Sequence, residues 1–179
     1  MSLSQKFVGL RIRLWYYVDK IRVVGLAWTI RWMARRVAAD AVAALLILDD
    51  GRDVMQLRDT LPTIFYPDHW GCFGGAVGDG EAPLAALKRE LQDEFEYTPG
   101  AATEFARFDF DFSWAGQPKV YRIYYEIHVP ATAFRRFVLH EGAAFEAIGG
   151  RDLLTQRKVT PYDAYAVWMH MSKQRFSQA

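Results

Sequence analysis

Hydrophobic and polar positions along the chain fall into runs that predict strands. Residues 41–48 form a continuous apolar run of strand length, and residues 54–58 return as a second strand after the turn at 49–52. Residues 108–112 alternate between phenylalanine and polar side chains, which is typical of a half-buried strand. Residues 119–129 are rich in aromatic and β-branched side chains. The pattern predicts a β-hairpin and two further strands of a sheet.

Between these strands the apolar spacing becomes helical. Four side chains fall three and four positions apart and are expected to face the core: Leu84, Leu87, Leu91 and Phe95. Pro83 suits the first turn of such a helix, where its missing N–H is no loss. Glu96 is not a residue favoured at a left-handed helix end, so we expect the helix to run on towards residues 98–100.

A last helix is predicted to begin at Thr160, with Pro161 as its first helical residue. Its apolar side is expected to comprise Tyr162, Tyr165, Ala166, Met169 and Met171. This helix should pack on the sheet, because an amphipathic helix buries its apolar stripe against a neighbouring layer.

Composition restricts the class of protein. The 179 residues are 51% hydrophobic, which predicts a globular domain with a proper core. The net charge of +1 gives no reason to expect a nucleic-acid partner. A single cysteine, Cys72, excludes an internal disulfide framework and favours a reducing compartment, so we expect a cytoplasmic location. Cys72 itself is expected to be a buried, inert thiol.

Charge separates the first residues from the rest. Residues 1–36 hold eight Lys and Arg and one acid, so they carry +7 and leave −6 for residues 37–179. We therefore expect a basic, apolar helical extension followed by one domain. The favoured interpretation of residues 5–36 is packing against their own domain or a second subunit, as in a homodimer. The alternative is an amphipathic helix at a membrane surface.

The candidate chemistry lies on the predicted central helix. Glu90, Asp93 and Glu94 share one helical face, because residues three and four apart are neighbours. Three adjacent carboxylates repel one another unless a cation lies among them. Oxygen ligands suit Mg²⁺, or alternatively Mn²⁺, rather than zinc. A surface helix with solvated acids is the other interpretation of the same pattern.

The spacing around these acids resembles the Nudix box, G-x5-E-x7-R-E-U-x-E-E-x-G-U, where U is bulky and apolar. Gly75, Glu81 and the run from Arg89 to Tyr97 fall on this pattern. Two positions depart from it. Asp93 stands where a Glu is expected and is one methylene shorter, and Glu96 stands where a Gly is expected.

The resemblance implies an α/β fold, a Nudix-type α/β/α sandwich with a mixed β-sheet over residues 37–179. It also implies Mg²⁺-dependent hydrolysis of a nucleoside diphosphate linked to another moiety, with a weak preference for nucleotide sugars. Glu90 and Glu94 would hold the metal, with Asp93 bound directly or through water. Arg89 would orient an acid such as Glu81 or Glu90. Glu141 would be a further ligand or the general base for water, ahead of two other acids, Glu126 and Glu146.

Substrate contacts are expected around the glycine-rich loop. The amides at Gly74 and Gly75 would meet phosphate oxygens. Arg58 or Arg122 would hold the other phosphate, and Tyr66 or alternatively Trp70 would stack on a nucleobase. Two alternatives remain open at this point: removal of oxidised nucleoside triphosphates, and a non-catalytic module that binds a nucleotide or a protein.

Overall fold

A computed structural model describes residues 38–62 and 64–176. The predicted N-terminal extension, residues 1–36, lies outside the described residues. The elements follow the order β1 (Ala41–Leu48), β2 (Asp53–Leu57), β3 (Trp70–Gly71), α3 (Pro83–Phe95), β4 (Thr103–Asp111), η1 (Ser113–Ala115), β5 (Lys119–Val129), α4 (Ala131–Phe134), β6 (Ala144–Ile148), α5 (Gly150–Gln156) and α6 (Pro161–Phe176). The four strands and two helices predicted from periodicity are therefore present.

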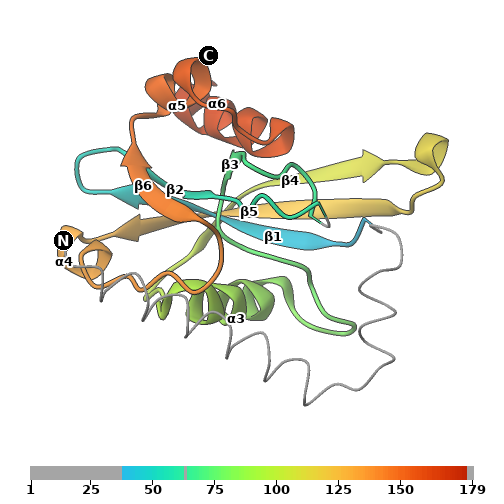
Figure 1. The fold of residues 1–179 in the computed structure, drawn as a ribbon, viewed down its shortest axis with the longest axis horizontal. Coiled ribbons are helices and arrows are strands. Elements are labelled where there is room, and N and C mark those ends of the chain that lie inside the picture. The colour runs from blue at the N-terminus through green and yellow to red at the C-terminus, as the bar shows by residue number, and fades with distance from the viewer. Residues whose placement is uncertain (1–37, 63, 177–179) are drawn as a thin grey trace. The chain divides into compact units, whose positions relative to one another are not determined.

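The strands form a mixed sheet in the order β3-β2-β1-β5-β4, with β6 paired to β2 (Figure 1). β1 and β2 are antiparallel, with Leu46 opposite Val54, which confirms the predicted hairpin. β1 and β5 are parallel from Ala41 opposite Arg122 to Leu48 opposite Val129. The remaining pairs are antiparallel within the described residues. The continuous apolar run of β1 thus reflects a central strand buried on both faces.

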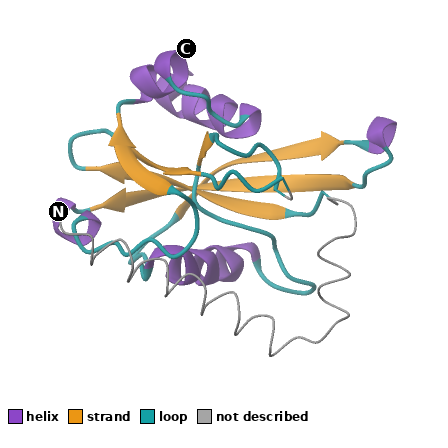
Figure 2. Ribbon diagram, viewed as in Figure 1, coloured by secondary structure: helices purple, strands orange, loops and turns teal. Residues whose placement is uncertain are grey.

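Alternate residues of β1 contribute to two separate cores. Val42 and Leu46 pack in the core beneath the sheet with α3, whereas Ala43 and Leu45 pack in the core above it with α5 and α6. Figure 2 shows the sheet between these two helical layers. The α/β/α sandwich with a mixed sheet is confirmed.

Two expectations about α3 are wrong. Leu84 is 37% exposed, so the buried stripe starts one turn later, at Ala86 and Leu87. The helix ends at Phe95 and does not run on, because Glu96 itself adopts the left-handed conformation, with φ 58°. The Glu96 side chain bonds His140 Nε2 at 2.7 Å, a contact that holds this helix end.

The apolar side of α6 also differs from the prediction. Ala166 and Val167 are fully buried, whereas Tyr165 and Met171 are about half exposed. At its start, Thr160 Oγ1 donates a hydrogen bond of 2.7 Å to the buried carboxylate of Asp163. The same carboxylate accepts hydrogen bonds from the Cys72 N–H at 3.0 Å and from the Tyr124 hydroxyl at 2.8 Å, which fix where α6 meets the sheet.

Candidate active site

The glycine-rich loop passes so close to β1 that it tolerates no side chain at Gly74. Its φ is +133°, and a Cβ there would lie 2.3 Å from the carbonyl oxygen of Val42. Backbone hydrogen bonds of 2.9 Å from Val42 to Gly75 and 2.8 Å from Ala44 to Phe73 bind the loop to the strand. The loop therefore has a fixed position, from which the Gly74 N–H points towards Glu94 on α3.

Glu94 reaches this loop from the buried side of α3. Its side chain accepts a hydrogen bond of 3.1 Å from the Gly74 N–H, and the residue is only 4% exposed. Burial raises the pKa of the Glu94 carboxyl well above its usual range, and the nearby charges of Glu141 and Glu90 raise it further. The Gly74 bond and the charge of Arg58 oppose this rise. Arg58 supplies one positive charge near Glu94. A cation bound beside this carboxylate would therefore be strongly favourable.

Glu90 lies one turn earlier, directly over Gly75. A Cβ at Gly75 would lie 2.4 Å from the Glu90 Cδ and within 2.7 Å of both carboxylate oxygens. The absence of a side chain at Gly75 is thus what lets the Glu90 carboxylate approach the loop. Glu90 and Glu94 consequently face the same short stretch of glycine backbone.

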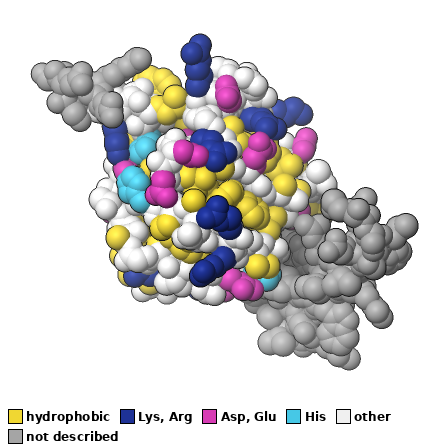
Figure 3. Space-filling model, turned by 90° about the vertical axis from the view of Figure 1, so that its left-hand side faces the viewer, with side chains coloured by type: hydrophobic (Ala, Val, Ile, Leu, Met, Phe, Trp, Pro, Cys, Tyr) yellow, Lys and Arg dark blue, Asp and Glu magenta, His cyan; other side chains and the backbone are white. Residues whose placement is uncertain are grey.

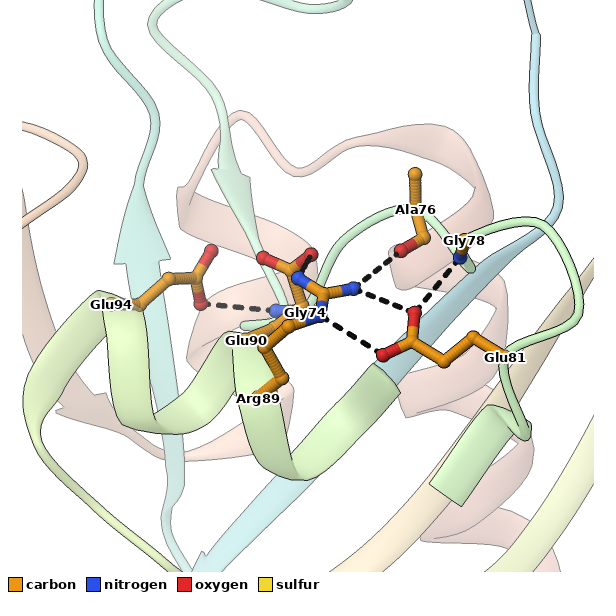
Figure 4. A network of polar contacts seen from close by, with 7 residues as sticks. All are labelled: Gly74, Ala76, Gly78, Glu81, Arg89, Glu90 and Glu94. Carbon is orange, nitrogen blue, oxygen red and sulfur yellow. Dashed lines mark hydrogen bonds and ion pairs between the residues drawn. The ribbon is translucent and has the colours of Figure 1, made fainter. Parts of the chain in front are cut away.

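Arg89 connects the helix to the acid at the far end of the loop (Figure 4). Its guanidinium binds both oxygens of Glu81, at 3.0 and 2.9 Å, and also donates to Glu90 at 2.6 Å and to the Ala76 carbonyl at 3.1 Å. The Gly78 N–H completes the shell of Glu81 at 2.9 Å. These bonds, with Arg89 first, lower the pKa of Glu81 to about 2. The predicted partners of Arg89, Glu81 and Glu90, are both present.

Glu141 is brought to the same region by a loop that the sequence did not predict in detail. Gln56 on β2 is buried and donates a hydrogen bond of 2.9 Å to the Glu141 carbonyl. Gly142 has φ +88°, and a Cβ there would lie 2.8 Å from the Gln56 side chain. The charge of Glu141 acts on Glu94 although the two are 47 positions apart. Gln56 belongs to no sequence motif, so its role in holding the Glu141 loop could not be predicted from the sequence.

Arg58 and Tyr66 lie on the loop that follows β2. Arg58 Nε donates to the Phe65 carbonyl at 3.0 Å, and its charge reaches both Glu94 and Tyr162. Tyr66 is 39% exposed and meets the Tyr162 ring edge-on at 5.7 Å between centroids. Arg58 is therefore close enough to the acids to bind an anion beside them, while the Tyr66 ring stays accessible.

Asp93 and Arg122 are placed differently from the residues above. Asp93 is exposed, and the acids whose charges act on Glu94 are Glu141 and Glu90. Arg122 is largely buried, with its guanidinium 3.4 Å from Asp163 and over the Tyr162 ring at 4.8 Å. Arg122 thus belongs to the buried contact between β5 and α6, and a direct metal bond from Asp93 remains a prediction.

The acid pair fits a hard divalent cation. Mg²⁺ is usually held by one or two protein carboxylates and completes its shell with water and substrate phosphate oxygens. Glu94 and Glu90 supply such a pair above the glycine loop, and Glu94 forms no ion pair within the described part of the chain. No three acidic, histidine or cysteine side chains of the described residues enclose a cation by themselves. The site therefore suits an open coordination sphere and not a closed protein cage.

The family model that matches this chain is the NUDIX domain, over residues 37–148. The chain belongs to the NUDIX family. This membership supports a pyrophosphohydrolase acting on acid anhydrides. The comparison with curated proteins returned no match.

Solved NUDIX structures have the same fold at low sequence identity. A MutT protein from Methanosarcina mazei Go1 is 17% identical with a TM-score of 0.62, covering 79% of this chain and 97% of its own. The NUDIX domain of Shewanella oneidensis NrtR, complexed with ADP ribose, is 14% identical with a TM-score of 0.61, covering 79% and 91%. A C. elegans Ap4A hydrolase is 14% identical with a TM-score of 0.59, covering 77% and 98%.

Lys and Arg side chains are interspersed with Asp and Glu on the face drawn in Figure 3, with hydrophobic side chains between them. None of the helices between residues 38 and 176 combines the length and apolar content needed to cross a bilayer.

Proposed function

We propose that this NUDIX protein is a Mg²⁺-dependent hydrolase that cleaves the pyrophosphate of a nucleoside diphosphate linked to another moiety, with nucleotide sugars favoured. The observation that carries the proposal is the buried carboxylate of Glu94, bonded to Gly74 at 3.1 Å beside two further acids. Such a carboxylate is unfavourable by itself and is stabilised by a bound cation. A cytoplasmic location and Mn²⁺ as an alternative ion belong to the same proposal.

Each residue has a distinct task in this mechanism. Glu90 and Glu94 would hold the cation, which when bound neutralises charge on the phosphate oxygens and lowers the pKa of water. Glu141 accepts a proton from the attacking water or adds a further oxygen ligand. Arg89 fixes Glu90 through its 2.6 Å hydrogen bond. The Gly74 N–H already donates to Glu94, so Arg58 and the Gly75 N–H bind the second phosphate, and Tyr66 stacks on the base.

The substrate class is supported by what the structural neighbours are named for. They include a protein complexed with ADP ribose, an Ap4A hydrolase and an E. coli dihydroneopterin triphosphate pyrophosphohydrolase. Each of these compounds contains a phosphoanhydride attached to a larger group. The partner of the present site is accordingly a nucleoside diphosphate derivative, and no nucleic acid is required.

The test is a panel of nucleotide sugars, dinucleotides and nucleoside triphosphates, oxidised ones included, assayed with Mg²⁺ for phosphate products. We expect Glu94→Gln to lower kcat at least about a hundredfold on the preferred substrate, because the cation that would neutralise the phosphate charge loses a carboxylate ligand. The matched control is Glu104→Gln, an exposed acid on β4, which should retain wild-type turnover.

The outcomes separate the alternatives. Turnover of nucleotide sugars supports the proposal, and turnover restricted to oxidised triphosphates would replace it with a sanitising activity. Binding without turnover across the whole panel would indicate a non-catalytic module. Normal turnover by Glu94→Gln would show that the catalytic assignment is wrong.

A further inference from the structure

Strand β4 forms one edge of the sheet. It pairs with β5 along one side, and no strand among the described residues pairs with its other side. The strand is nine residues long, Thr103–Asp111, and a β-bulge lies between Glu104 and Ala106. A long edge strand presents unpaired N–H and C=O groups that can pair with another chain.

This edge carries charges of both signs, with Arg107 positive and Glu104, Asp109 and Asp111 negative. The strand contains neither Lys nor Pro, the residues that most often prevent edge pairing. It carries Arg107 and Asp109 on one face, joined by a hydrogen bond of 2.9 Å and exposed by 48% and 70%. An edge with both signs can complement a copy of itself, whereas a single-sign edge cannot.

The opposite face of the same edge is aromatic. The Phe108 ring lies 5.1 Å from Tyr165 on α6, and Tyr165 stacks with Trp168 at 6.1 Å between centroids. Tyr165 and Trp168 are about half exposed. We name these three residues the aromatic band. Exposed aromatic side chains grouped in this way are typical of interaction surfaces.

We propose that two copies of this protein associate by antiparallel pairing of their β4 strands, with Phe108 opposite Phe108 of the second copy. In this register Arg107 lies opposite Asp109 of the second copy, and Asp109 lies opposite Arg107. Four charges then alternate around the two-fold axis. A two-fold interface of this kind is self-complementary, as a closed dimer requires.

The neighbouring registers are excluded by charge and by the pleat. A shift of one residue would place the aromatic face of one copy beside the charged face of the other, since side chains alternate with a period of two. Centring the pair on Arg107 places two arginines opposite each other, and centring it on Asp109 places two aspartates opposite each other. Like charges directly opposite one another are destabilising. Of these three registers, the one centred on Phe108 avoids both.

This pairing makes one continuous sheet from two chains. Both α6 helices then lie on the same side of it, so the aromatic bands approach each other across the two-fold axis. The band and the charge quartet lie on opposite faces of the sheet, so the interface combines apolar burial with charge pairing. The surface is separate from the acids near Gly74, and its test is independent of the hydrolase proposal.

The experiment is sedimentation velocity on the full chain over a range of concentrations, with three charge variants. We expect the wild type to dimerise. Arg107→Asp and Asp109→Arg should each weaken the dimer at least about tenfold, because each converts two attractive pairs into repulsive ones. The double variant R107D/D109R restores alternating signs and should dimerise like the wild type. High salt should weaken the wild-type dimer.

The matched control is Arg52→Asp, which removes an exposed ion pair of 2.7 Å to Asp50 in the β1–β2 turn. It should leave the dimer unchanged. Circular dichroism establishes that each single variant is folded before its association is interpreted. A wild type that stays monomeric at every concentration overturns the proposal. So does a dimer that the single variants leave intact, or one that the double variant fails to restore.

Discussion

Arg89 binds Glu81 through two parallel hydrogen bonds, from Nε at 3.0 Å and from Nη2 at 2.9 Å. A planar guanidinium matches a carboxylate in this bidentate geometry, and a lysine ammonium does not. The remaining Nη1 atom binds Glu90 at 2.6 Å. One side chain thereby couples the acid of the glycine loop to an acid of the helix.

Arg89→Lys should therefore impair metal use more than stability. A single ammonium cannot bind Glu81, Glu90 and the Ala76 carbonyl at once, so Glu90 loses its fixed orientation. We expect the Mg²⁺ concentration for half-maximal activity to rise about 10- to 100-fold, the usual effect of removing a group that orients a ligand. Activity measured against Mg²⁺ concentration tests this.

Arg52→Lys is the control for that substitution, because Arg52 also binds an acid, Asp50, with two nitrogens but in an exposed turn. Its Mg²⁺ dependence should equal that of the wild type. An unchanged Mg²⁺ curve for Arg89→Lys would show that Arg89 does not orient Glu90.

Alanine substitutions at the adjacent residues Gly74 and Gly75 should affect different properties, stability at Gly74 and activity at Gly75. At Gly75 the new Cβ meets the Glu90 carboxylate, the far end of a flexible side chain, so the fold can adjust while the acid moves. We expect Gly75→Ala to keep its melting temperature but to lose about a hundredfold in kcat, since small displacements of catalytic groups have large effects. Thermal melts and steady-state kinetics give both quantities.

At Gly74 the new Cβ meets the Val42 carbonyl at 2.3 Å, and φ is +133°. Backbone cannot yield as a side chain does, so Gly74→Ala should lower the melting temperature markedly. If Gly75→Ala destabilises as strongly as Gly74→Ala, the close approach of Glu90 is not the reason for glycine there.

The parts of the site that lie close together in sequence were predictable. The Nudix box lies within one loop and one helix, so its spacing alone placed Glu90, Arg89 and Glu94 relative to Gly75. The resemblance to the Nudix box implied that Arg89 pairs with Glu81 or Glu90, and it binds both. Local geometry is what a linear motif encodes.

Features that depend on distant residues were not predictable. Glu96 adopts φ 58° against its own preference, with a hydrogen bond to His140, 44 positions away. The helical periodicity predicted that Leu84 faces the core. Periodicity does not show where the sheet that covers the helix ends, and Leu84 is exposed. Gln56 on β2 donates a hydrogen bond to the Glu141 carbonyl, 85 positions later in the chain. No local sequence pattern predicts this contact.

Asp53 is a buried acid outside the active site, and it predicts how stability depends on pH. It starts β2, is 4% exposed, and lies near Gly150 at the start of α5. Burial raises the pKa of its carboxyl from 3.8 to about 6. Between these values the unfolded chain has lost the proton and the folded chain keeps it, so the free energy of unfolding falls as pH rises through this range.

Asp53→Asn should remove that fall, because an amide of nearly the same shape does not ionise. At pH 7 the variant should gain up to about 3 kcal/mol relative to the wild type, from a pKa difference of about two units. At pH 4 the two proteins should differ much less. Urea unfolding at both pH values measures the difference, and a stability change equal at pH 4 and pH 7 would show that ionisation of Asp53 is not its cause.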